Sequence, residues 1–60
     1  MDYTQFAGLN VRIITNGGII YIGHVWGFSF DETDENVLEV WIDLDTVDVE
    51  DIASIEECKQ

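Results

Sequence analysis

The sequence predicts a mostly β domain, a small barrel of five strongly bent antiparallel strands with a short N-terminal helical turn. Three observations favour this fold. Apolar and polar residues alternate with a period of two over most of the chain, as in strands with one buried face. An Asn16-Gly17-Gly18 turn separates two runs rich in β-branched residues. Gly23 and Gly27 lie inside the second run, and internal glycines mark bulges or bends in a strand.

The N-terminal half predicts one helical turn and two strands. Residues 2–8 can form the turn, with Asp2 or Thr4 near its start and Gly8 as a stop signal. The β-branched run over 10–15 predicts the first strand. The second strand is expected over 19–30, and its two glycines would let it bend and take part in both sheets of a small barrel.

The C-terminal half predicts three shorter strands after an acidic loop over 31–36. They are expected over 37–44, around 46–49 and around 53–56, with a one-turn connection over 49–52. One face of the third strand is apolar, and we predict that it belongs to the core. That face comprises Leu38, Val40, Ile42 and Leu44, and the opposite face comprises Val37, Glu39, Trp41 and Asp43.

The second strand is apolar on both faces, which requires burial on both sides. Tyr21 and Val25 lie on one face, and the other carries Ile20, Ile22, His24 and Trp26. The second of these faces, together with Trp41, is a candidate interface between subunits. The alternative is that the N-terminal turn covers it through Tyr3 and Phe6.

Residues 1–60 are expected to form a single domain, because a chain of this length is near the limit of independent stability. Oligomerisation would supply the missing burial, since Cys58 has no partner within the chain. Without a signal peptide or a long apolar run, the chain is expected in the cytoplasm, with Cys58 as a free thiol in a frayed tail. A disulfide between chains stays open.

The net charge of the chain disfavours some classes of partner. The chain has thirteen acidic residues and only two basic ones, Arg12 and Lys59, for a formal net charge of −11. Such a surface repels nucleic-acid phosphates and anionic lipids, because Lys and Arg supply most non-specific affinity for nucleic acid. RNA binding is therefore disfavoured, and no membrane partner is expected.

The stretch Val11 to Phe28 resembles the first motif of the Sm and Sm-like (LSm) family, a family of SH3-like small barrels. The motif is an apolar strand, a turn with Asn-Gly, four residues, a glycine, an apolar step, and a second glycine before an aromatic residue. It stands here as VRIITNGG, IIYI and GHVWGF. The resemblance implies a bent five-stranded barrel and a cyclic homo-oligomer of about five to seven subunits, in which the fourth strand of one chain pairs with the fifth of the next.

The resemblance also implies where RNA would bind. In RNA-binding members, an Asp and an Asn after the second strand and an Arg-Gly pair before the last strand surround the base. Phe30, Asp31 and Asn36 form the corresponding candidate RNA or ligand loop. Glu50-Asp51 stands in place of Arg-Gly, which removes both a stacking plane and a positive charge.

No catalytic, cofactor or metal site is predicted. His24 is the only histidine and has no companion at metal-ligand spacing. The carboxylates of Asp31, Glu32, Asp34 and Glu35 could hold Ca²⁺ or Mg²⁺ loosely, but they lack EF-hand spacing, so a solvated loop is favoured.

We therefore expect a non-enzymatic oligomeric binding module, an Sm-like ring that binds a protein partner or, weakly, an RNA segment read by stacking. The alternative is an acidic protein that mimics nucleic acid and occupies a basic host protein, as small phage proteins can. Filter binding of oligonucleotides tests RNA binding, and recovery of basic proteins from a lysate tests mimicry.

Overall fold

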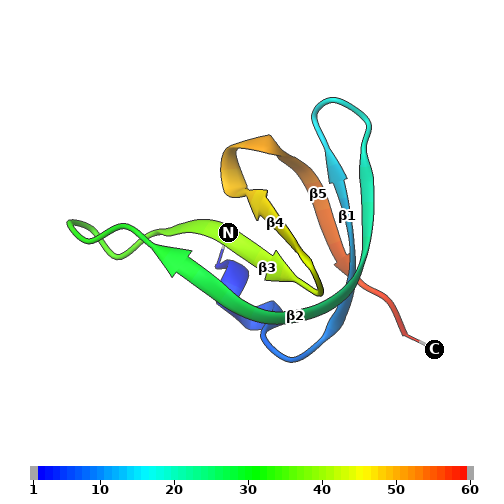
Figure 1. Cartoon of the computed structure of the whole chain (residues 1–60), viewed down its shortest axis with the longest axis horizontal. Helices are drawn as coiled ribbons and strands as arrows, with labels where there is room; N and C mark the ends of the chain where they lie inside the picture. The colour runs from blue at the N-terminus through cyan, green and yellow to red at the C-terminus, as the bar shows by residue number, and fades with distance from the viewer. Residues whose placement is uncertain (1, 60) are drawn as a thin grey trace.

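In the computed structural model, which describes residues 2–59, five antiparallel strands form one sheet in the order β4-β3-β2-β1-β5 (Figure 1). The mostly β prediction is confirmed, and the N-terminal turn is a single 3-10 turn. The elements are η1 (Tyr3–Phe6), β1 (Asn10–Thr15), β2 (Ile20–Phe30), β3 (Val37–Ile42), β4 (Asp45–Asp48), η2 (Val49–Asp51) and β5 (Ile52–Glu57).

The β1–β2 hairpin forms at the predicted turn. Gly18 adopts a φ of 86°, a left-handed conformation that glycine reaches without steric cost. Its N–H donates to the carbonyl of Thr15 at 3.0 Å, while the Thr15 hydroxyl accepts the N–H of Ile19 at 3.0 Å. Asn16 ties the turn to η2, because its N–H donates to the carbonyl of Asp51 at 2.7 Å.

β2 is the strand around which the fold is bent. Its first half pairs with β1, from Ile14 opposite Ile20 to Asn10 opposite His24. Its second half pairs with β3, where the register shifts between Val25 and Gly27. Figure 1 shows β2 curving from the hairpin with β1 to the side of β3. One long strand thus serves both halves of the sheet, as the internal glycines predicted.

The predicted closure into a barrel is wrong, because the sheet stays open. β4 and β5 are its two edge strands, and no ladder joins them within residues 2–59. β4 has only four residues, and the three-residue turn η2 links its end directly to the start of β5. Each of these two strands therefore has one free edge.

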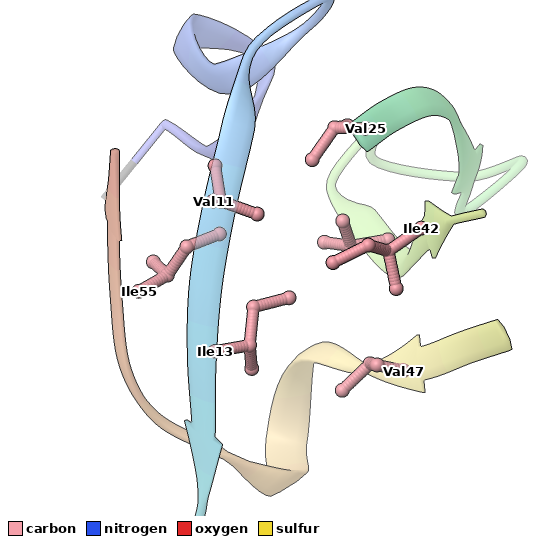
Figure 2. Packing of buried hydrophobic residues seen from close by; sticks show 7 residues of the cluster. Val11, Ile13, Val25, Ile42, Val47 and Ile55 are labelled. Carbon is pink, nitrogen blue, oxygen red and sulfur yellow. The ribbon is translucent and has the colours of Figure 1, made fainter. Parts of the chain in front are cut away.

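The core lies inside the bend and draws on every strand (Figure 2). Its buried side chains are Val11, Ile13, Val25, Val40, Ile42, Val47 and Ile55. Val40 and Ile42 confirm half of the predicted core face of β3. Leu38 and Leu44 contradict the other half, with exposed fractions of 48% and 102%. Leu44 lies in the β3–β4 loop, and Leu38 lies beyond the last residue that β4 covers, Glu39.

The C-terminal end of β5 is held more firmly than predicted. The N–H of Cys58 donates to the carbonyl of Asn10 at 2.8 Å, which continues the β1–β5 ladder, and the side chain of Cys58 is half-buried. The expected fraying at this residue is therefore wrong. Within residues 2–59, no helix is long and apolar enough to cross a membrane.

Candidate functional site

The predicted interface residues of β2 share the outer face of the sheet. Ile20, Ile22 and Trp26 have exposed fractions of 56%, 67% and 61%, while Val25 on the opposite face is fully buried. Of the two readings of this face, cover by the N-terminal turn is wrong, since Tyr3 and Phe6 pack against the core. The β2 outer face therefore stays open to solvent.

Two tryptophans lie together on this face, which we call the tryptophan face (Ile22, Trp26, Trp41 and Leu44). The ring centroids of Trp26 and Trp41 are 5.1 Å apart, with planes tilted by 47°. The register shift after Val25 places Gly27 opposite Trp41. A Cβ atom at Gly27 would lie 2.5 Å from Cε3 of Trp41. The absence of a side chain at Gly27 thus lets the indole of Trp41 lie on the backbone of β2.

Asp43 holds the β3–β4 loop against β2. Its N–H donates to the carbonyl of His24 at 3.1 Å, and its Oδ1 accepts the N–H of His24 at 3.3 Å. Its carbonyl accepts the indole N–H of Trp26 at 2.8 Å. The carboxylate lies over Gly23, where a Cβ atom would overlap it. These contacts orient Trp26, and Leu44, the residue after the carbonyl that binds the Trp26 indole, is fully exposed.

Polar groups lie along the β1 side of the same face. Nδ1 of His24 is 3.4 Å from Oδ1 of Asn10. Arg12 stands opposite Ile22 and forms an ion pair with Glu56, with Nη2 and Oε1 3.0 Å apart. No three His, Cys, Asp or Glu side chains gather as a metal site in the described part of the chain. The chemistry that this surface offers is apolar contact, aromatic stacking and carboxylate charge.

The predicted RNA or ligand residues lie together at the base of the acidic loop. Phe30 pairs with Val37, and the N–H of Asp31 donates to the carbonyl of Asn36 at 2.8 Å. Oδ1 of Asp31 accepts the N–H of Thr33 at 2.7 Å and that of Asp34 at 3.4 Å. The carboxylate of Asp31 therefore shapes its own loop.

A recess next to this loop reaches the N-terminal turn and η2. Its lining includes Tyr3, Glu35, Asn36, Val37 and Val49. Glu50 and Asp51, which replace the Arg-Gly pair of the resemblance, lie within η2. Neither basic residue of the chain lines the recess, so no cation is placed there to bind a phosphate.

Acid should weaken the loop over 31–36. The backbone N–H groups of Thr33 and Asp34 lower the pKa of Asp31, because they bond to its charged form. A lowered folded-state pKa means that the contribution to stability is present above the ordinary aspartate pKa and is lost as pH falls through the lowered value. An NMR titration of the Asp31 carboxyl should show a midpoint below the ordinary range. The protection factor of the Thr33 amide, its exchange relative to an unfolded peptide at the same pH, should fall in parallel.

Asp31→Asn is the control for this pH dependence, since it keeps an acceptor oxygen and removes the charge. The protection factor of its Thr33 amide should show no fall caused by acid. A midpoint for Asp31 at or above the ordinary aspartate value would contradict the expectation.

Sequence reasoning missed Asp43 and Leu44, which it assigned to the third strand. The signal was present, because Asp favours turns and tolerates positive φ, and Asp43 has a φ of 47°. A two-residue loop at Asp43-Leu44 joins Ile42 to Asp45.

Searches of protein-family models, curated proteins and solved structures found nothing that matches this chain.

Proposed function

We propose that the chain is a non-enzymatic binding module that assembles into a cyclic, Sm-like homo-oligomer, in which each open sheet is continued by those of its neighbours. The observation that carries this proposal is the open sheet, whose edge strands β4 and β5 are both unpaired along one side. An unpaired edge presents a row of N–H and C=O groups that can bond to another strand. Two different edges on one chain favour a head-to-tail contact, which closes into a ring when the rotation between copies permits.

The backbone groups at the β4 edge point the right way for this contact. Ile42 and Asp45 flank the two-residue loop between β3 and β4, and such flanking residues bond to each other. The N–H of the next residue, Thr46, therefore points away from β3. On the other edge, the first four residues of β5, from Ile52 to Ile55, carry no charge.

Charge selects the register of the contact. β4 carries Asp45 and Asp48, and β5 ends on Glu56 and Glu57. Like charges directly opposite each other destabilise a strand pair. Pairing β4 with the uncharged first half of the next subunit's β5 keeps these four carboxylates apart.

We expect assembly to strengthen with salt, because added ions screen repulsion between chains of net charge −11. Sedimentation velocity should show the average mass rising as NaCl is raised from about 20 mM to about 500 mM. Thr46→Pro removes the outward N–H and should leave a monomer at every salt concentration. Thr46→Ala keeps the N–H and should assemble like the natural chain.

Circular dichroism identifies variants that fold, and only those are compared. Two results contradict the proposal. One is a folded natural chain that stays monomeric at high concentration and high salt, and the other is a folded Thr46→Pro that assembles as the natural chain does.

A nucleic-acid mimic is the second candidate, and the placement of the acidic groups favours it. Eleven of the thirteen acidic residues are exposed, since only Asp31 and Glu39 are half-buried. A basic nucleic-acid-binding protein should then bind the chain at low salt, and DNA should displace the chain from it. Failure of DNA to compete would count against mimicry.

A further inference from the structure

The exposed part of the tryptophan face is too apolar to be explained by the fold alone. Ile22, Trp26 and Leu44 have exposed fractions of 67%, 61% and 102%, and the ring of Trp26 packs against that of the half-buried Trp41. Contiguous apolar surface rimmed by polar residues marks contact sites for other molecules. We propose that the tryptophan face docks a segment of a partner protein that carries apolar side chains next to Lys or Arg. This site gives the proposed binding module its partner, and so it rests on that proposed function.

The two indoles are held in place before any partner arrives. Trp26 is fixed by its hydrogen bond to the carbonyl of Asp43, and Trp41 by the bare backbone of Gly27 beneath it. Side chains that are already ordered lose little conformational entropy on binding. Tryptophan is also enriched among the residues that carry most of the binding energy at protein interfaces.

A hollow with opposed carboxylates lies at β3 and β4, and one of these carboxylate residues, Glu39, shares a face of β3 with Trp41. Glu39 and Asp48 stand directly opposite each other in β3 and β4, and Trp41 follows Glu39 by two residues on that face. The hollow is lined by both carboxylate residues together with Ser29, Val37, Val49 and others. Like charges facing each other across two strands destabilise the pair. A Lys or Arg side chain placed between them relieves this repulsion.

The spacing suits an extended segment. Alternate side chains of a strand share one face and lie about 7 Å apart, as do Glu39 and Trp41 themselves on β3. A partner strand with an apolar residue two positions from a basic one can thus stack on Trp41 and Trp26 while its cation reaches the hollow.

A second copy of this chain does not meet these requirements. It carries only two basic residues, and Arg12 is engaged by Glu56 of its own chain. Docking copy on copy through this face would bring Asp43, Glu39 and Asp48 toward their counterparts. Assembly through the sheet edges uses backbone groups of β4 and β5 and not the indoles, so we assign the predicted interface residues Ile22, Trp26 and Trp41 to a partner of opposite charge.

The test uses the natural fluorescence of the chain, whose two tryptophans both lie on this face. A peptide of about ten residues that alternates lysine with leucine is the probe. A peptide of the same charge that alternates lysine with serine is its control. The lysine–leucine peptide should shift the tryptophan emission to the blue and bind about tenfold more tightly than the control, with an affinity that falls as NaCl is raised.

Matched variants locate the site. Glu39→Gln with Asp48→Asn should weaken the lysine–leucine peptide about tenfold, whereas Glu32→Gln with Glu35→Gln, the same charge change in the acidic loop, should weaken it less than about twofold. Leu44→Ser should also weaken binding. Because Leu44 is fully exposed, this variant tests the face without disturbing the core.

Three results would overturn the docking site. The first is equal binding of both peptides without an emission shift, which indicates attraction by net charge alone. The second is equal loss in the two carboxylate double variants. The third is a blue shift on raising the protein concentration without peptide, which indicates that a second copy covers the face. If the chain binds the peptide but stays monomeric, only the edge pairing is overturned. The two contacts can be told apart because peptide binding should weaken with salt, whereas assembly should strengthen with it.

Discussion

Ile13→Ala should leave the chain without a cooperative folded state. Ile13 is fully buried, and it lies at the centre of β1 between Tyr21 of β2 and Ile55 of β5. Truncating a buried isoleucine to alanine costs about 2–5 kcal/mol. A single core in a chain of this length rarely supplies more than about 3–5 kcal/mol. Thermal unfolding followed by circular dichroism should therefore show no sigmoidal transition for this variant.

Ile20→Ala is the matched control for the core substitution. It makes the same chemical change in the neighbouring strand, at a residue that is 56% exposed. Surface substitutions of this kind usually change stability by less than about 0.5 kcal/mol. A comparable loss of stability in both variants would show that the core does not lie inside the bend of the sheet.

Gly27→Ala should destabilise the chain by about 1–3 kcal/mol, the usual cost of forcing an added group into a packed site. The new Cβ atom would lie 2.5 Å from the indole of Trp41, so that ring must move away from β2 and from Trp26. Urea unfolding should show the loss of stability. Near-ultraviolet circular dichroism should show a weaker signal from the tryptophan pair.

Gly17→Ala is the control for the glycine substitution. A Cβ atom there meets nothing closer than the hydroxyl oxygen of Thr15 at 4.0 Å, and its backbone is not left-handed. Its stability should stay near that of the natural chain, or rise slightly because alanine restricts the unfolded state. Unchanged stability and an unchanged tryptophan signal in Gly27→Ala would contradict the close approach of Trp41 to β2.

The two salt responses distinguish the surfaces of this acidic chain. Contacts between copies oppose carboxylate to carboxylate, so screening favours them, whereas contacts with a basic partner lose attraction when screened. The open edges of β4 and β5 are backbone surfaces, and the tryptophan face is a side-chain surface. Leu44→Ser alters the tryptophan face and removes no backbone N–H from either edge, whereas Thr46→Pro removes an edge N–H at the residue opposite Trp41, so Thr46→Ala serves as its control.

Signals that depend on near neighbours in the chain were sufficient to predict most of the elements. The β-branched run and the Asn-Gly-Gly turn predicted β1 with its observed bounds, Asn10–Thr15. The internal glycines predicted that β2 bends and serves both halves of the sheet. The apolar residues on both faces of β2 predicted burial on both sides; Val25 is buried on one face, whereas Ile20, Ile22 and Trp26 on the other are exposed. Alternation, turn chemistry and glycine are local properties, which a single sequence displays directly.

Only the tertiary structure decided whether the sheet closes and which residues distant in sequence lie next to one another. The free edges of β4 and β5 depend on where strands distant in sequence end in space. The contact of Trp41 with Gly27 depends on a register shift, and alternation does not reveal on which residue such a shift falls. Leu44 looked like core because it continued the pattern of β3, yet a turn at Asp43 carries it into solvent. A change of one residue in register or strand length reverses the face of every later side chain, so these features follow from the packing of the whole chain.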